Sequence, residues 1–238
     1  MRRYLLLLAL ALLAAMPVSS KKKEKRSVVR LETSMGVIRI ALLDDAPLHR
    51  DNFLKLTEAG FYDGLLFHRV IRDFMVQAGD SASRHALPGQ PLGEGDVGYT
   101  LPAEILLPYY YHLRGAVAAA REPDDVNPEM RSSGSQFYIV WGRSWAPKSI
   151  KDQRAALAEK GNEMTRDMRD AYEQYGGSPH LDGQYTVFGE VGEGMDVVRR
   201  MQQVATDSLD RPVDDVRIEH AVVEQRSKAA LRDGAKIR

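Results

Sequence analysis

The sequence is 238 residues long, which fits one domain or at most two small ones and is ample for a sizeable hydrophobic core. Hydrophobic residues make up 44% of the chain and charged residues 28%, values that exclude a disordered protein and a polytopic membrane protein. The 33 Lys and Arg side chains are balanced by 33 Asp and Glu side chains, so we predict no nucleic-acid partner. The sequence contains no cysteine, which excludes disulfides, thiolate zinc sites and cysteine nucleophiles.

The first twenty residues have the layout of a secretory signal peptide. Arg2 and Arg3 give a basic start, and the stretch from Leu5 to Ala15 is continuously apolar. We predict cleavage after Ser20, export to the periplasm or cell envelope, and no stable membrane insertion after cleavage. The alternative is a membrane anchor that is not cleaved, although the apolar stretch is shorter than the roughly 20 residues that a spanning helix needs.

Two short basic segments flank the predicted domain. Residues 21–27 contain four lysines and one arginine, and residues 226–238 form a second basic segment at the end of the chain. Because both segments are short and unrepeated, we interpret them as a solvated linker and a solvated tail rather than as arms that bind anionic partners. The predicted domain therefore comprises residues 28–225.

The apolar pattern of this domain predicts many short strands and few helices. The β-branched stretches Val28–Leu31 and Val37–Leu42 flank a turn and predict a hairpin. Helices are predicted at Pro47–Ala59, which Gly60 ends, and at Met195–Gln203. Further strands are predicted at residues 67–71, 74–77, 115–119, 136–140, 186–191 and 216–223. Such a pattern favours a β-barrel or a β-sandwich.

Residues 148–178 interrupt the strand pattern with a predicted pair of helices. Ser149–Asp152 resembles a helix cap, and an Ala-rich stretch continues to Glu159. The second helix carries a stripe of large side chains at helical spacing: Met164, Met168, Tyr172 and Tyr175. We interpret this stripe as packing against the parent domain, and the alternative is a face that binds a partner.

The glycine-rich segment Gly93–Gly98 fits the spacing of a dinucleotide-binding loop but not its context. No clear strand precedes it, Tyr99–Pro102 follows where a helix is needed, and Glu94 and Asp96 would repel a pyrophosphate. The six histidines have no ligand-like spacing. The sequence therefore predicts neither a cofactor nor a metal site.

One stretch, from Phe67 to Asp80, places an arginine and a glutamine on adjoining strand segments. Phe74 and Met75 lie between Arg69 and Gln77, and strand alternation puts Arg69 on the opposite face from its neighbour His68. A guanidinium with five donors then stands beside an apolar outer surface. Taken alone, the pattern also fits an ordinary surface arginine that lies over hydrophobic side chains.

Four segments occur in the order of a known family: Phe67–Asp80, Gly115–Arg121, Ser133–Ile139 and Leu181–Val191. With them, the sequence resembles the cyclophilin family of peptidyl-prolyl cis-trans isomerases over residues 28–223, except across the helical insertion. The resemblance implies a mainly β fold, namely a closed eight-stranded antiparallel barrel capped by helices. The inserted helical pair is an addition to that fold.

The resemblance also implies a substrate groove on the outer wall of the barrel. It assigns catalysis to Arg69 and Gln77. It assigns the wall of the proline pocket to Phe74, Met75, Phe137 and Leu181, and the contacts with the flanking peptide to Ala120, Arg121, Gln136 and Tyr185. Two residues depart from the family pattern, because Tyr185 replaces a histidine and His180 stands where many members have tryptophan. We expect these changes to affect ligand preference rather than the reaction.

The implied reaction is rotation about X-Pro bonds in exported proteins that are unfolded or partly folded. Such rotation has a barrier of about 18–20 kcal/mol and needs neither a nucleophile nor a general base. We predict that Arg69 donates a hydrogen bond to the prolyl nitrogen of the twisted amide, in a monomeric enzyme whose partners are proline-containing polypeptides. The alternative is a cyclophilin-like binding module with little catalysis.

Overall fold

The computed structural model describes residues 25–227 of the chain. The predicted signal peptide, the first part of the linker and most of the C-terminal tail lie outside the described residues. Within residues 25–227, the helices are all too short or too polar to span a lipid bilayer.

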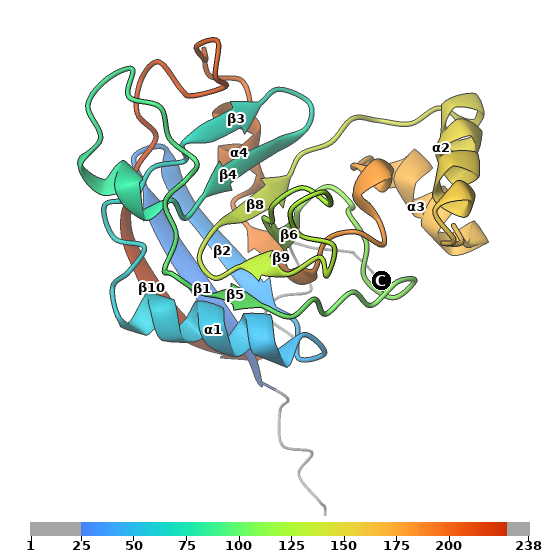
Figure 1. The fold of residues 1–238 in the computed structure, drawn as a ribbon, viewed down its shortest axis with the longest axis horizontal. Helices are drawn as coiled ribbons and strands as arrows, with labels where there is room; N and C mark the ends of the chain where they lie inside the picture. The colour runs from blue at the N-terminus through green and yellow to red at the C-terminus, as the bar shows by residue number, and fades with distance from the viewer. Residues whose placement is uncertain (1–24, 228–238) are drawn as a thin grey trace, which may run out of the picture.

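Eight antiparallel strands form one curled sheet around a common core (Figure 1). Their order in the sheet is β10-β1-β2-β9-β6-β8-β4-β3. The bounds are β1 Lys25–Thr33, β2 Gly36–Leu42, β3 Arg69–Ile71, β4 Met75–Ala78, β6 Ala116–Ala119, β8 Phe137–Val140, β9 Val187–Glu193 and β10 Ile218–Ser227. A separate two-stranded sheet pairs β5 (Thr100–Leu101) with β7 (Ser132–Ser133). The predicted fold class is confirmed.

Backbone hydrogen bonds join the two ends of this sheet and close the barrel. The N–H of Phe67, just before β3, donates to the carbonyl of Val216 at 2.8 Å. The N–H of Ile218 on β10 donates to the carbonyl of Leu65, also at 2.8 Å. The segment that precedes β3 therefore lies against the first strand of the sheet order, so the residues that follow it on β3 and β4 are held in a fixed position.

The strands β1 and β2 form the predicted hairpin, with Thr33 paired to Gly36. Gly36 has a φ of 131°, in the region that favours glycine, and a Cβ there would lie 2.9 Å from the Val197 side chain. The β1–β10 pair is longer than predicted, because Lys25 pairs with Ser227. Residues 25–27 and 226–227, which the sequence assigned to the linker and the tail, therefore belong to strands.

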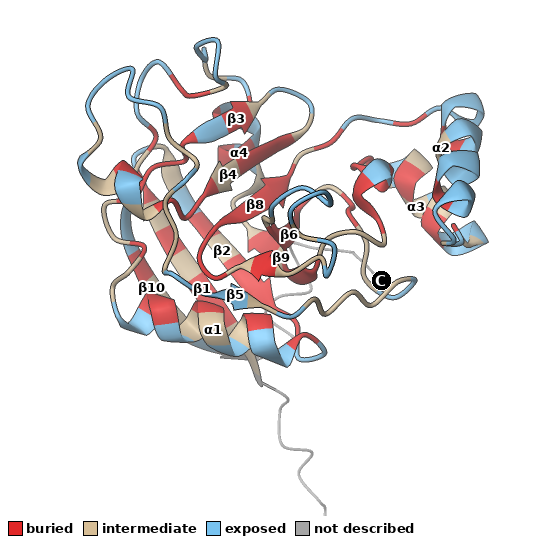
Figure 2. Ribbon diagram, viewed as in Figure 1, coloured by how far each residue is buried: buried red, intermediate tan, exposed pale blue. Residues whose placement is uncertain are grey.

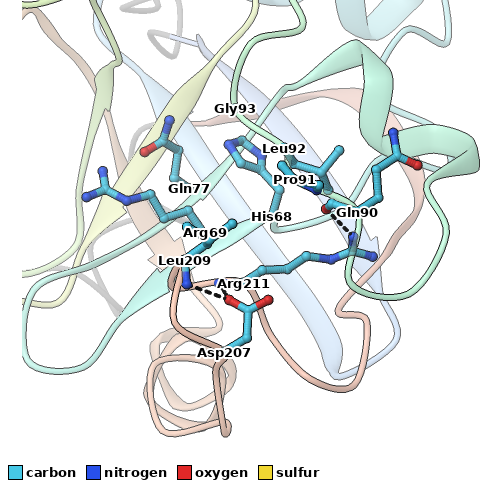
Figure 3. A pocket seen from close by; sticks show the side chains of 10 residues that line it. All are labelled: His68, Arg69, Gln77, Gln90, Pro91, Leu92, Gly93, Asp207, Leu209 and Arg211. Carbon is cyan, nitrogen blue, oxygen red and sulfur yellow. Dashed lines mark hydrogen bonds between the residues drawn. The ribbon is translucent and has the colours of Figure 1, made fainter.

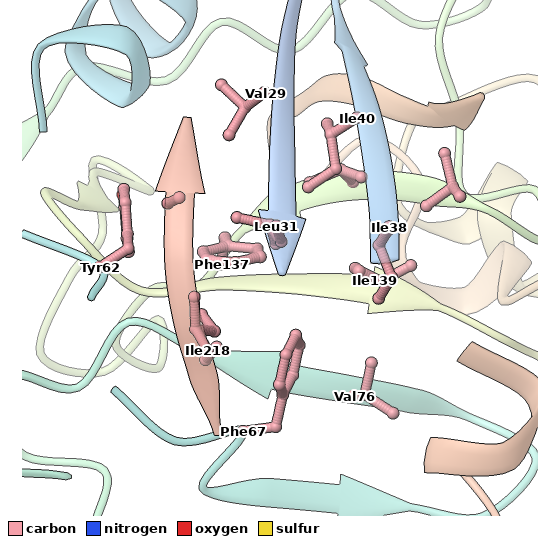
Figure 4. Close-up of a cluster of buried hydrophobic side chains, with 14 of the residues drawn as sticks. Val29, Leu31, Ile38, Ile40, Tyr62, Phe67, Val76, Phe137, Ile139 and Ile218 are labelled. Carbon is pink, nitrogen blue, oxygen red and sulfur yellow. The ribbon is translucent and has the colours of Figure 1, made fainter. Parts of the chain in front are cut away.

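The hairpin strands alternate between buried and less buried residues (Figure 2), and their buried side chains, among them Leu31, Ile38 and Ile40, belong to the barrel core (Figure 4). Helix α1 (Pro47–Glu58) begins with Pro47 in its first turn, as predicted, and covers one opening of the barrel with Phe53. The Phe53 ring lies 5.1 Å from Phe137 and 4.9 Å from Tyr62, between ring centroids. The short helix α4 (Met195–Met201) buries Val197, Val198 and Met201 in the same core.

The inserted pair consists of α2 (Pro147–Glu159) and α3 (Arg166–Tyr175), which stand to one side of the barrel (Figure 1). Helix α2 starts two residues before the predicted Ser149, because Pro147 fits the first turn of a helix. The buried side chains of the Met/Tyr stripe pack with Leu113 and Trp145 of the parent domain, which confirms the packing interpretation. Helix α3 ends at Gly176, and the short 3-10 turn Pro179–Leu181 follows.

Candidate active site

Arg69 and Gln77 lie directly opposite each other in the β3–β4 pair, so their side chains share one face of the sheet. The Arg69 side chain is 45% exposed, and its Nε lies 3.5 Å from a carboxylate oxygen of Asp210 (Figure 3 shows the arginine beside Gln77). The terminal nitrogens of the guanidinium therefore reach solvent and any ligand bound against this face. The predicted proximity of the arginine and the glutamine is realised by strand pairing.

Gln77 is oriented by a second glutamine. Its Nε2 donates to Oε1 of Gln136 at 2.9 Å, and Gln136 Nε2 donates in turn to the carbonyls of Gly93 at 2.7 Å and Gly95 at 2.9 Å. The Gln77 amide oxygen points away from this bond and remains an acceptor. Gln136 is itself buried and holds the Gln77 carboxamide in place, and its contact with the flanking peptide stays a prediction.

A cavity of about 300 Å³ opens beside Arg69 on the outer wall of the barrel. All of the predicted site residues except Gln136 and Phe137 line it, and Tyr138 is an additional member. The complete lining is Arg69, Phe74, Met75, Gln77, Ala120, Arg121, Tyr138, Leu181 and Tyr185. The cavity thus joins one guanidinium and one carboxamide to an aromatic and aliphatic wall, a composition that suits a small apolar ring carrying a polar amide.

The prediction that Phe137 forms part of the pocket wall is wrong. Phe137 is 1% exposed and belongs to the barrel core, where its ring meets those of Phe53 and Tyr62. Neighbouring residues of a strand point to opposite faces, so Tyr138 occupies the wall position on the outside. Phe137 and Ile139 point into the core, and Tyr138 between them points outward. The sequence alone contains this signal, because strand residues alternate between faces.

Arg121 and Tyr185 form a fixed rim of the cavity. The guanidinium carbon of Arg121 lies 4.7 Å from the centroid of the Tyr185 ring, a cation–π contact. The Nε of Arg121 also donates to the carbonyl of Gln184 at 2.8 Å, and a terminal nitrogen forms a 2.6 Å ion pair with Asp124. These bonds engage Nε and Nη1 and hold the guanidinium of Arg121 against the Tyr185 ring, and they leave Nη2 as the nitrogen available to a peptide.

His180 lies against the aromatic wall from the side of the insertion. Its ring centroid is 5.3 Å from that of Phe74. Burial lowers the pKa of His180, so the imidazole is neutral at and above neutral pH. This residue therefore adds an uncharged aromatic surface to the rim.

Sequence reasoning missed a buried polar network behind the cavity wall. The imidazole of His112 lies 2.9 Å from the Asp182 carboxylate through Nδ1, and 3.0 Å from the Tyr138 hydroxyl through Nε2. The same carboxylate accepts a 2.7 Å hydrogen bond from the hydroxyl of Tyr172 on α3. No sequence motif joins these residues, because the two members of the His–Asp pair are 70 positions apart.

A second cavity of about 180 Å³ adjoins the other side of Arg69 and Gln77 (Figure 3). His68 and Arg211 contribute to its lining together with residues 90–93. Burial lowers the pKa of His68 to about 4, so this imidazole is neutral at physiological pH.

The glycine-rich segment that resembles a dinucleotide loop wraps around a carboxylate instead. The N–H of Gly93 donates to Asp80, and a Cβ at Gly95 would lie 1.9 Å from the same side chain. Within residues 25–227, no group of three or more histidine, cysteine, aspartate or glutamate side chains is arranged to hold a metal ion.

Comparisons with known proteins agree with this geometry. Residues 28–223 match the family model for cyclophilin type peptidyl-prolyl cis-trans isomerases. A Staphylococcus epidermidis protein described as a peptidyl-prolyl cis-trans isomerase is 35% identical over 83% of this chain and 91% of its own length. The chain therefore belongs to the cyclophilin-type peptidyl-prolyl cis-trans isomerase family.

Two further similarities concern length and fold. A Streptococcus pyogenes bifunctional phosphatase/peptidyl-prolyl cis-trans isomerase is 35% identical over 80% of this chain, which spans only 37% of that relative. The crystal structure of a Cryptosporidium parvum cyclophilin type isomerase superimposes with a TM-score of 0.62 and 22% identity, covering 85% of this chain and 99% of that one. The second similarity concerns the fold alone.

Proposed function

We propose that this protein catalyses the cis-trans rotation of X-Pro bonds in exported polypeptides that are unfolded or partly folded. The observation that carries the proposal is the 300 Å³ cavity, which places the guanidinium of Arg69 at the edge of an apolar wall formed by Phe74, Met75 and Leu181. A prolyl ring fits that wall, and its amide nitrogen then lies on the side of the guanidinium.

The proposed mechanism follows from the electronic structure of the amide. Rotation breaks the resonance between nitrogen and carbonyl, at a cost of about 18–20 kcal/mol. In the twisted state the prolyl nitrogen regains its lone pair and accepts a hydrogen bond that the planar amide cannot accept. A donor held at that position binds the transition state more tightly than either ground state, and this difference lowers the barrier. Arg69 is that donor.

The remaining side chains hold the two parts of the peptide that rotate against each other. The apolar wall fixes the ring and excludes water, which strengthens the contact with Arg69. The Nε2 of Gln77 is bonded to Gln136, so its second N–H and its oxygen are the groups available to the peptide. One side of the amide is thus held by packing and the other by polar contacts.

The assay for this function is proline cis-trans exchange in a short peptide, measured by NMR with and without the protein. Acceleration of exchange at catalytic protein concentrations supports an isomerase. The alternative, a binding module, predicts that peptide resonances shift on titration while the exchange rate stays at its uncatalysed value. The active species in this proposal is a monomer, because one chain supplies the arginine, the glutamine and the apolar wall that the reaction needs.

Export with cleavage after Ser20 belongs to the same proposal. It is supported by the basic start and the apolar stretch Leu5–Ala15. Mass spectrometry of the protein from the cell-envelope fraction is expected to find Lys21 at the N-terminus. Recovery of the intact Met1 chain in the membrane fraction would replace this proposal by a membrane-anchored enzyme.

A further inference from the structure

Four buried side chains form a continuous hydrogen-bonded chain from the inserted helices to the wall of the main cavity. The Tyr172 hydroxyl on α3 donates to Oδ2 of Asp182 at 2.7 Å. The other oxygen of this carboxylate accepts the backbone N–H of His112 and lies close to Nδ1 of the same residue, at 2.9 Å in each case. The Nε2 atom then lies 3.0 Å from the hydroxyl of Tyr138. The four residues are between 0% and 5% exposed.

The chemistry of the carboxylate gives the directions of the hydrogen bonds along this series of residues. A carboxylate only accepts, so Nδ1 of His112 carries a proton, and in the neutral imidazole Nε2 is then an acceptor. In this form of the imidazole the hydroxyl of Tyr138 donates inward to Nε2. Burial raises the pKa of both Tyr138 and Tyr172 well above the usual value, so both hydroxyls keep the protons that they donate.

This series of hydrogen bonds holds the Tyr138 ring, which forms part of the wall of the proline pocket, at its hydroxyl end. Packing alone limits the Tyr138 ring on two sides, since it stacks on His112 at 6.1 Å and meets Tyr185 edge-on at 6.0 Å. The hydroxyl bond adds a fixed point at the far end of the ring. Asp182 orients the imidazole that provides this point, and Tyr172 is the partner that orients the second oxygen of the carboxylate.

We propose that Tyr172 of the inserted helix α3 is a positioning residue for the isomerase site, acting through Asp182 and His112 on the pocket-wall residue Tyr138. The inserted helical pair is then a component of the active site and not only an attachment to the barrel. The proposal rests on the isomerase function argued above. It gives the inserted pair α2 and α3 a role in the active site.

The expected kinetic effect follows from where Tyr138 acts. The pocket wall contacts the prolyl ring in the ground state and in the transition state alike, so loosening it weakens both. A change of this kind raises KM and leaves kcat nearly unchanged. Loss of Arg69, in contrast, lowers kcat. A purely structural role of Tyr172 would reduce thermal stability without changing KM.

The test is Tyr172→Phe, which removes one oxygen atom and keeps the ring in its cluster. We expect KM for an X-Pro peptide to rise by about three- to tenfold, with kcat within about twofold of the wild type. The matched control is Tyr175→Phe, on the same helix and packed against the same cluster, whose hydroxyl has no hydrogen-bond partner among the described residues. That variant should have wild-type kinetics.

A double-mutant cycle then tests the route of the effect. Tyr138→Phe alone should raise KM to a similar extent, and Tyr172→Phe added to it should cause no further change. The proposal is overturned if Tyr172→Phe leaves KM unchanged, or if the two substitutions multiply their effects on KM. If the wild type binds the peptide without accelerating exchange, the proposed function fails. The dissociation constant of the peptide, measured by NMR titration, then replaces KM in the same cycle.

Discussion

The guanidinium of Arg69 and the carboxylate of Asp210 form an ion pair between β3 and the loop that leads to β10, with 3.5 Å between Nε and Oδ2. The same loop residue accepts a 2.8 Å hydrogen bond from the backbone N–H of Val70. Asp210 has a φ of 62°, a left-handed conformation that aspartate and asparagine tolerate better than most residues. The carboxylate is thus fixed on the Nε side of the arginine, whose side chain lines the cavity.

Substitution of Asp210 by asparagine should therefore reduce catalysis while preserving the loop. We expect kcat/KM to fall by about two- to fivefold at low ionic strength, since the half-exposed ion pair contributes about 1 kcal/mol or less. Added salt should narrow the difference between the wild type and Asp210→Asn, because it screens the pair. Equal activity of both proteins at low salt would show that packing alone orients Arg69.

Replacement of Arg69 by alanine should remove most of the isomerase activity. The loss should be about 10-fold or more in kcat/KM, because the variant lacks the donor that is specific to the transition state. The control is Arg72→Ala, which removes an exposed arginine of the β3–β4 turn. Circular dichroism and the melting temperature should show that both variants are folded. A turnover within about twofold of the wild type in Arg69→Ala would refute the mechanism.

The opposite orientations of Phe137 and Tyr138 lead to separable effects on stability and activity. Phe137→Leu should lower the free energy of unfolding by about 1–3 kcal/mol, because the ring lies in the core, and should leave KM of the folded fraction unchanged. Tyr138→Leu should raise KM, since it alters the cavity wall. Urea denaturation and steady-state kinetics on both variants measure the two effects. An increase in KM for Phe137→Leu alone would place that ring in the site.

Acid should destabilise the fold through His68. The pKa of this imidazole is lowered to about 4 by burial, whereas the unfolded chain has the ordinary value of about 6.5. Between these values the unfolded state binds more protons, so the free energy of unfolding decreases as the pH falls from about 6.5 to 4. The total loss from this group is about 3 kcal/mol.

Urea denaturation at pH 7 and pH 4 measures this dependence. The variant His68→Gln should lose less stability between the two pH values than the wild type does. The control His85→Gln removes an exposed histidine and should retain the wild-type dependence. An unchanged pH dependence in His68→Gln would mean that other groups account for the acid sensitivity.

Some of the architecture could be predicted from the sequence because it depends on local signals. The β-branched strands, Pro47 at the start of α1 and the helical spacing of Met168, Tyr172 and Tyr175 all belong to this class, whereas Met164 lies just before α3. The extension of β1 to Lys25 could not be predicted, since a polar strand end gives no hydrophobic alternation and depends on pairing with β10. Local pattern specifies such elements only where one of their faces is buried.

The candidate site also contains residues whose proximity follows from local pattern and residues whose proximity depends on long-range packing. Arg69, Gln77 and the Phe74–Met75 pair lie on one short hairpin, so their proximity follows from strand pairing. The contact of His112 with Tyr138 and Asp182 instead depends on how a loop and the insertion pack behind β8, which no periodicity encodes. Strand alternation alone separates Phe137, which faces the core, from Tyr138, which faces the cavity.

The two ends of the insertion meet at a narrow neck, where Arg143 forms a β-bridge with Gly177 and the Trp145 indole N–H donates to the Gly177 carbonyl at 2.9 Å. A Cβ at Gly177 would lie 2.3 Å from the carbonyl oxygen of His112, so only glycine allows this approach. Since the neck is closed by its own backbone pairing, the register of the barrel strands does not depend on the number of residues beyond it. The entropy of closing a loop grows only with the logarithm of its length. The neck is therefore a position at which this barrel can exchange one peripheral segment for another of different length and keep its strands in place.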